Sequence, residues 1–332
     1  MRTKRTPVWL PYLHEIEHES KDVYIFRYNG GEVRAPLSTI SSIMIYGDYG
    51  TLDCAIVEQI SRKGIPIIIH RRGVAHPIYI CNPIRADQND TLTKQLLARQ
   101  DQRKARHIAR KLLLAKFYSM QWLVPAPPPP SIHASIKELR SIEAVHSAGY
   151  WREYYRRLGC PASTRRGSGQ ISAALNAGST FISGILLRWI TYHHLSPFHG
   201  YLHTTSDYSS LVYDLIEPYR AHFDKCIFEA AQTIKEPDSN AVMVAIAINA
   251  IKDSLNGEIY TGLTRQIVTR HELLHGLVLS LKSYLNGEQR SFMIPTADKP
   301  KGGRPKKTNF RLYGRQAGRT DFWAVAKRVS SD

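Results

Sequence analysis

The chain has 332 residues, which is enough for two domains that each bury a hydrophobic core, because single cores usually stop growing before this length. Lysine and arginine number 45 against 28 aspartates and glutamates, and they recur along the whole chain; this favours a polyanionic partner such as nucleic acid, although a merely soluble basic protein would show the same balance. The cysteines form no CxxC pair, which excludes a zinc knuckle and a dithiol redox motif; they are Cys54, Cys81, Cys160 and Cys226.

The N-terminal segment, "MRTKRTPVWLPYLHEIEHES", is basic but lacks the apolar run of a signal peptide. Nowhere does the sequence contain the roughly 18 consecutive uncharged apolar residues that a membrane span requires. We therefore expect a cytoplasmic protein with no membrane contact.

Residues 1–88 are predicted to form a small β-sheet domain with one helix. The segment "VYIFRYNGGEVRAP" places the NGG turn at 29–31 between two strand-like runs, and these residues accept the positive φ angles of a hairpin turn. The segments "SSIMIYGDYG" and "GIPIIIH" add short β-branched strands, and a further hairpin is expected around residues 72–73. Apolar residues at helical spacing predict a helix over 51–64.

Residues 89–290 are predicted to be helical. The first helix should start at Asp90 or Thr91 and continue to residue 124, where "PAPPPP" at 125–130 breaks it, because proline lacks the backbone N–H. This helix has a strongly basic face, and we expect it to bind DNA phosphates through Arg103, Lys104, Arg106 and Arg110.

The rest of the chain continues as helices. A helix is expected over 135–158, followed by an exposed basic loop, "RRGSG" at 165–169, and then by apolar helices at about 170–194, 209–233, 239–255 and 263–286. Three more arginines are expected to bind DNA, namely Arg165, Arg166 and Arg220. The predicted fold class is therefore α+β, with a small β domain, a larger all-α domain and a basic tail over 291–332.

Two acids stand three residues apart in the helix predicted at 209–233. Asp214 and Glu217 would project from one face, where their charges repel. One explanation is local: Asp214 interacts with the helix dipole, and Glu217 pairs with Arg220. The other is a divalent cation, since carboxylates together with His203 suit Mg²⁺ or Mn²⁺ and would permit phosphodiester chemistry. Taken alone, His203 would be a structural histidine and Glu143 a solvated glutamate.

Four segments carry a family resemblance: "SIEAVHSAGYW", "ISAALNAG", "LSPFHGYLH" and "SLVYDLIEPYRAHFD". In their order and spacing they resemble the CRISPR-associated integrase and endonuclease family, whose members insert spacers. The resemblance covers roughly residues 140–230, and the β domain is similar to that family's N-terminal domain. Two positions depart from the family pattern, Ala144 and Ser172.

The resemblance implies a function and a site. The family's counterparts of Glu143, His203 and Glu217 hold the metal, and the counterpart of Asp214 lies beside it as a further catalytic acid. We therefore expect an enzyme that depends on Mg²⁺ or Mn²⁺ and joins 3′-OH ends of short spacer DNA to a repeat array by transesterification. The expected partners are DNA, a second copy of the chain in a homodimer, and a small second CRISPR-associated adaptation protein.

Other interpretations remain open. The same catalytic family includes transposon-encoded integrases, the casposases, and a non-catalytic DNA-binding module would have the same basic faces. "HELLH" at 271–275 is an HExxH motif, which on a helix can bind zinc in a metallopeptidase, although no third ligand follows it at a suitable spacing. The tail over 291–332 could bind the DNA minor groove or remain solvated.

Overall fold

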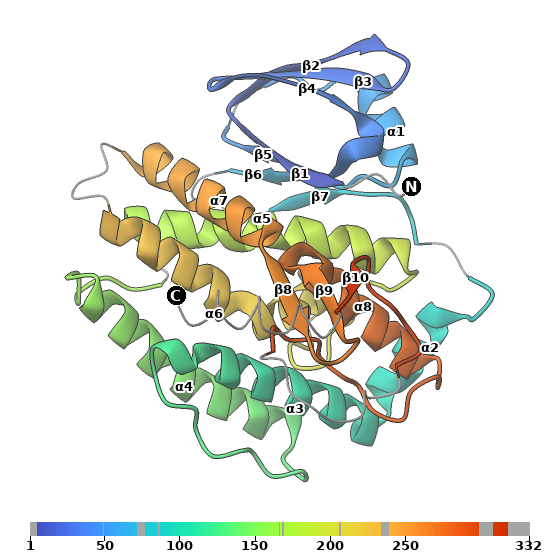
Figure 1. Ribbon diagram of the computed structural model, residues 1–332, viewed down its shortest axis with the longest axis vertical. Coiled ribbons are helices and arrows are strands. Elements are labelled where there is room, and N and C mark those ends of the chain that lie inside the picture. Colours follow the sequence, from blue (N-terminus) through green and yellow to red (C-terminus); the bar gives the residue numbers. More distant parts are fainter. Residues whose placement is uncertain are drawn as a thin grey trace.

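The computed structural model describes residues 5–48, 50–71, 77–84, 87–165, 167, 169–205, 207–233, 239–298 and 308–317. Figure 1 shows the N-terminal strands stacked on a larger helical region, with the long helix α5 directly beneath one of the sheets. The order of elements, strands first and helices afterwards, confirms the predicted α+β fold.

The N-terminal region contains two sheets. The first has the strand order β1-β5-β6-β7, and the second is an antiparallel meander, β2-β3-β4. Tyr28 pairs with Gly31, so the tight turn lies where the NGG segment predicts it. Strands were expected only from residue 23, so β1 and the charged, largely exposed β2 were missed. The elements are β1 (Thr6–Pro11), β2 (Leu13–Ser20), β3 (Val23–Tyr28), β4 (Gly31–Pro36), β5 (Ile40–Tyr46), α1 (Cys54–Arg62), β6 (Ile67–His70) and β7 (Ile78–Ile80).

The β1-β5-β6-β7 sheet rests on α5 (Gln170–Tyr192). Gly184 permits the close approach, because a Cβ there would lie 2.7 Å from Cδ1 of Ile68. Arg188 joins the two layers by donating to the carbonyl of Gly64 at 2.7 Å. By length and composition α5 could cross a membrane, but 72% of its apolar window is buried, as in the core helix of a globular protein. The predicted hairpin around residues 72–73 lies outside the described residues.

In the helical region, α3 packs along α6, and α5 packs along both α6 and α7. Four helices match the predicted ranges closely, and two of them begin at a capping serine, Ser135 for α4 and Ser239 for α7. The elements are α2 (Thr91–Gln100), α3 (Gln102–Ser119), α4 (Ile136–Arg157), α5, α6 (Ser210–Thr233), α7 (Asn240–Asn256), β8 (Glu258–Thr261), β9 (Gln266–Thr269), α8 (Arg270–Leu285) and β10 (Arg315–Gln316).

The single long helix predicted from Asp90 or Thr91 to residue 124 is wrong. It is interrupted at Asp101, whose backbone is extended with φ −69° and ψ 102°. The Asp101 carboxylate accepts hydrogen bonds from the backbone N–H groups of Arg103 and Lys104, so it caps the start of α3. The α2 and α3 helices are therefore separate elements that can take different directions.

The helix predicted over 263–286 is also wrong at its beginning. Residues Glu258–Thr261 and Gln266–Thr269 form an antiparallel hairpin, and α8 starts only at Arg270. The hairpin gains a third strand from the C-terminal segment, because β10 pairs with β9. Gln266 holds that segment by donating to the carbonyl of Leu312 and accepting from its N–H. Part of the expected tail thus packs against the helical region.

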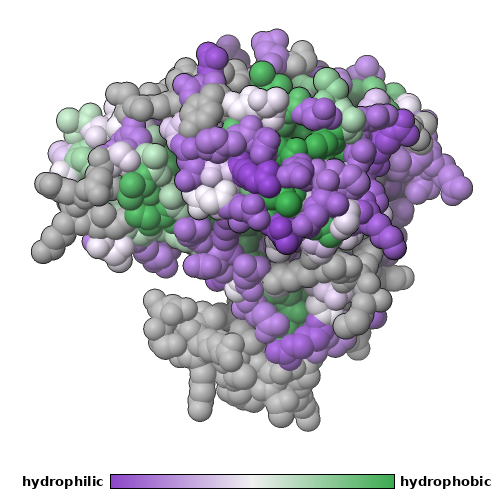
Figure 2. All heavy atoms as spheres, turned by 90° about the horizontal axis from the view of Figure 1, so that it is seen from above, coloured by the Kyte–Doolittle hydropathy of each residue, from purple (hydrophilic) through white to green (hydrophobic). Residues whose placement is uncertain are grey.

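The surface seen from the side of the N-terminal sheets is mostly hydrophilic. Figure 2 shows hydrophilic side chains over most of this face, with smaller hydrophobic patches between them. Such mixed coverage is ordinary for a protein surface and does not by itself indicate a partner.

Candidate functional site

Three side chains from distant parts of the sequence meet within the helical region. Glu143 comes from α4, His203 from the connection before α6, and Glu217 from α6. One potential ligand atom of each lies within 4.8 Å of the other two, and the described part of the chain holds no other such group of three. The residues predicted as metal ligands therefore converge, although more than seventy positions separate the first from the last.

Glu143 is positioned by a well-defined helix. A capping box starts α4: the Ser135 hydroxyl accepts from the N–H of Glu138, and the Glu138 carboxylate accepts from the N–H of Ser135. Leu139 is buried one turn before Glu143, so both lie on the inward face of α4. The interpretation of Glu143 as a solvated surface glutamate is wrong, because it is 9% exposed.

Asp214 lies beside the cluster and not within it. Its two carboxylate oxygens accept from the backbone N–H groups of Tyr201, Leu202 and His203, and one of them also contacts Nδ1 of His203 at 2.8 Å. Gly200 permits this turn, because a Cβ there would lie 2.8 Å from the Asp214 carboxylate. Asp214 therefore shapes the connection that carries His203.

The contact with Asp214 also determines what His203 can offer. A histidine that donates from Nδ1 to a carboxylate presents the lone pair of Nε2, which is the form that ligates metals. Burial alone would lower the pKa of His203, but Asp214, followed by Glu217 and Glu143, raises it above the ordinary value. An added cation between the two glutamates would offset that effect and favour the neutral ring.

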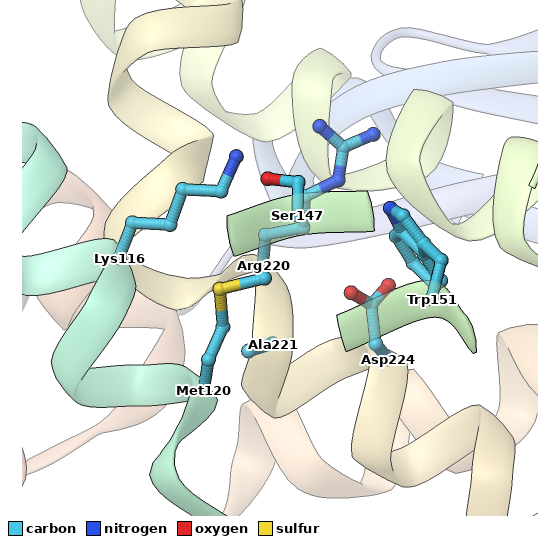
Figure 3. A pocket seen from close by; sticks show the side chains of 7 residues that line it. All are labelled: Lys116, Met120, Ser147, Trp151, Arg220, Ala221 and Asp224. Atoms are coloured by element: carbon cyan, nitrogen blue, oxygen red, sulfur yellow. The ribbon is translucent and has the colours of Figure 1, made fainter. Parts of the chain in front are cut away.

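A lysine that sequence reasoning missed lies between the two glutamates. The Lys116 ammonium is 2.6 Å from Oε1 of Glu143 and 2.7 Å from Oε2 of Glu217. Arg220 adds a second cation, with Nη1 at 2.7 Å from Oε1 of Glu217. Figure 3 shows Lys116 and Arg220 extending from α3 and α6 around a small cavity that Asp224 also lines. The one available signal was the position of Lys116 one turn after Leu112 on the apolar side of α3.

These contacts keep the Glu217 carboxylate charged. Burial alone would raise the pKa of Glu217, but Lys116 and Arg220 hold it at about 2. Burial alone would likewise lower the pKa of Lys116, whereas Glu217 and Glu143 raise it above its ordinary value. Glu217 is thus ionised at neutral pH, as binding of a hard divalent cation requires.

The residues expected to bind DNA fall into two groups. Arg103 and Lys104 are exposed at the start of α3. The others have internal partners: Arg106 and Arg110 donate to backbone carbonyls of the proline-rich connection, Arg165 stacks over Trp151 and donates to Asn176, and Arg220 pairs with Glu217. Arg166 lies outside the described residues.

The HELLH segment forms a packed histidine cluster. His275 lies with Nδ1 3.5 Å from Glu272 and Nε2 2.9 Å from Nε2 of His193, and its ring stacks on Trp189 with 3.8 Å between centroids. Among the described residues, neither histidine of the motif belongs to a group of three potential metal ligands. These contacts give the motif a role in packing α8 against α5.

Comparison with known proteins identifies the family. The sequence profile of CRISPR associated protein Cas1 matches residues 13–126 and 130–243. A casposase bound to an integration product is 18% identical, with a TM-score of 0.72 over 98% of this chain and 99% of that chain. The TtCas1–DNA complex is 18% identical, with a TM-score of 0.58 over 94% and 99% of the two chains.

A Cas6-RT-Cas1–Cas2 complex contains a chain that is 14% identical, with a TM-score of 0.70; the match covers 88% of this chain and 36% of that longer chain. No curated protein matches the sequence. The profile match includes the converging residues Glu143, His203 and Glu217 and extends over more than half of the sequence, so this chain belongs to the family of CRISPR associated protein Cas1.

Proposed function

We propose that the protein is a metal-dependent DNA integrase and endonuclease of CRISPR adaptation. The observation that carries the proposal is the convergence of Glu143, His203 and Glu217 in a chain of the Cas1 family. Two carboxylates and one imidazole suit Mg²⁺ or Mn²⁺. The Lys116 ammonium between the two glutamates supports the fit, because it shows that a positive charge is accommodated there.

In the proposed reaction a 3′-OH attacks a phosphorus of the target strand. One phosphodiester bond forms while another breaks and releases the target's own 3′-OH, so no protein nucleophile is needed. A bound divalent ion would polarise the phosphate and favour ionisation of the attacking hydroxyl. Glu143, Glu217 and Nε2 of His203 would hold the ion, Asp214 would orient His203, and Arg220 would keep Glu217 in place.

DNA is the proposed substrate, and two protein partners are proposed with it. The similar structures support this: one is a casposase bound to an integration product, another is a complex with DNA, and a third is a complex that contains Cas2. We propose that the chain forms a homodimer, so that two active sites can join the two ends of one spacer, and that it binds a small Cas2-like protein.

A casposase-like role is the second candidate. It is favoured by the casposase match, which extends over almost the full length of both chains. The two roles share the chemistry and differ in the DNA that is joined. A preference for spacer-length duplexes and a repeat target would support CRISPR adaptation, whereas a preference for particular terminal sequences would support transposition.

The test is a strand-transfer assay with a labelled duplex and a supercoiled plasmid carrying a repeat. Glu143→Gln and His203→Ala should each reduce joining by more than about 100-fold, beyond the effect of losing a residue that only orients a ligand. Glu153→Gln on the same helix is the control, because Glu153 pairs with Arg156 and Arg157 at the surface. Full activity of His203→Ala, or of the wild type in excess chelator, would refute the mechanism. DNA binding without any joined or cut product would favour a non-catalytic binding module.

A further inference from the structure

A second polar cavity lies on the other side of Arg220 from Lys116. Its volume is about 140 Å³, several times the roughly 30 Å³ that one water occupies in the liquid. It lies between the N-terminal sheet and the helical region, because residues of both line it. The lining residues include His70, Tyr79, Arg165, Asn176, Tyr213 and Arg220.

Three residues that line this cavity carry a buried polar atom without a hydrogen-bond partner. Nδ1 of His70 has no hydrogen-bond partner although the residue is only 7% exposed, and Nε of Arg165 and Nε of Arg220 are also unpaired. A buried polar group that is left unsatisfied costs about 1–3 kcal/mol. Two of these three atoms, the Nε–H groups of Arg165 and Arg220, are donors that belong to lining residues, which favours a ligand that accepts hydrogen bonds.

The charges around the cavity indicate that this ligand is an anion. Two guanidinium groups line it, and burial followed by repulsion from Arg220 lowers the pKa of Arg165 to about 10. Asp224 attracts both arginines, but it lines the smaller cavity next to Lys116 and does not line this one. The two arginines therefore face the larger space without a carboxylate in its lining.

The neighbouring phenols and amide suit a phosphate. Tyr79 and Tyr213 line the same space, and burial raises the pKa of both, so their hydroxyls remain protonated donors. Asn176 contributes an amide whose oxygen already accepts from Arg165, which leaves its NH₂ group to donate. Guanidinium groups with neutral donors around them form a typical phosphate-binding environment.

We propose that this cavity is a phosphate-binding subsite that holds a DNA phosphodiester next to the reacting one. Arg220 links the two places, since its Nη1 contacts Glu217 while its Nε is unpaired beside the cavity. Tyr213 lies on the same path, with its ring centroid 6.5 Å from that of His203. The identification of the ligand as DNA rests on the proposed function. Free inorganic phosphate would offer the same oxygen acceptors to the cavity.

The experiment titrates the full-length protein with two probes, inorganic phosphate and the dinucleotide thymidylyl-thymidine, and follows binding by ³¹P NMR. Chelator is present throughout, so binding does not depend on the metal. Arg165→Gln should weaken both probes about tenfold, the effect of one lost charge-assisted hydrogen bond. Arg152→Gln, an exposed arginine of α4, is the matched control and should leave binding unchanged.

A second variant, Asn176→Asp, provides an independent test in case Arg165→Gln does not fold. Asn176→Asp keeps the size of the side chain and adds a negative charge to the cavity, so it should weaken both probes at least as much. Equal binding by the wild type and both cavity variants would overturn the subsite. Tighter binding of inorganic phosphate than of the dinucleotide would overturn its assignment to DNA. If the wild type showed no strand transfer but still bound phosphate in chelator, the proposed function would be refuted and the phosphate site would stand.

Discussion

Lys116 provides the sharpest test of how the site is held together. Replacement by methionine keeps most of the side-chain volume and removes the charge that lies 2.6 Å from Glu143 and 2.7 Å from Glu217. Removing one partner of a buried ion pair typically costs 3–5 kcal/mol. Because Arg220 still pairs with Glu217, and because Glu143 is not fully buried, we expect the free energy of unfolding to fall by about 3 kcal/mol, the lower end of that range.

A divalent cation should reverse this loss. A ligand that binds only the folded state adds about 2.7 kcal/mol of stability at a concentration of 100 times its Kd. In the wild type the ion must displace the Lys116 ammonium from the glutamates, whereas in Lys116→Met that competing charge is absent. Mn²⁺ should therefore stabilise the variant more than the wild type.

The assay is urea unfolding at pH 7, in chelator and in excess Mn²⁺, followed by circular dichroism. Lys104→Met is the control, because Lys104 is exposed near the start of the same helix. Two results would refute the reasoning: a Lys116→Met protein within 1 kcal/mol of the wild type in chelator, compared with the approximately 3 expected, or an equal gain from Mn²⁺ in both proteins.

Two further predictions concern neighbouring acids. Asp214→Asn should lower the melting temperature and weaken Mn²⁺ binding, since an amide cannot accept from all the N–H groups that now contact the carboxylate; calorimetric melting and a Mn²⁺ titration check this, and unchanged values for both would contradict it. Glu217 should make the fold acid-sensitive: its pKa is about 2 in the folded protein and 4.5 ordinarily, so its stabilisation is present above about pH 4.5 and is lost as the pH falls toward 2. Urea unfolding across this range should show a shallower loss for Glu217→Gln, and identical pH profiles would rule the assignment out.

The helices were largely predictable because their signals are local. The helix expected at 209–233 is α6, Ser210–Thr233, and the one expected at 239–255 is α7, Asn240–Asn256. In both, apolar residues recur at helical spacing, and these residues are buried. Asp101 was missed for the opposite reason: one capping carboxylate within a charged helical stretch is a weak signal against strong helix formers on both sides.

The hairpin before α8 depends on contacts that no local window contains. Gln266–Thr269 pairs with β8 on one side and, on the other, with residues 315–316 from the end of the chain. Its β-branched residues can also fit a helix, so the pairing decides the structure. The register is then fixed by a side chain, Gln266, that bonds the backbone of Leu312.

Sequence reasoning predicted only those residues of the candidate site that belong to a family motif. Glu143, His203 and Glu217 were found through the family resemblance, and the structure brings them together. Lys116 belongs to none of the resembling segments, and its position one turn after Leu112 does not indicate that packing of α3 on α6 places it between two glutamates. Arg165 was expected in an exposed loop but lines a cavity, and its guanidinium lies over Trp151, 5.4 Å from the ring centroid.

The contacts of α6 explain why acids occur within its apolar sequence. Its apolar residues Leu211 and Leu215 are fully buried, and its acids Asp214, Glu217 and Asp224 are buried as well. Burying a charge is tolerable if it meets an opposite charge or a row of donors, and the contacts of Asp214 and Glu217 meet that condition. Burial instead raises the pKa of Asp224 to about 6.

Arg220 belongs to both sites, because it contacts Glu217 and also lines the larger cavity. A substitution there would disturb both places at once and could not tell a metal site from a phosphate subsite. Lys116 pairs with the two glutamates of the cluster and does not line the larger cavity, whereas Arg165 lines that cavity. Variants of these two residues therefore separate the two functions: Lys116→Met should change the response to Mn²⁺ and spare phosphate binding in chelator, and Arg165→Gln should do the reverse.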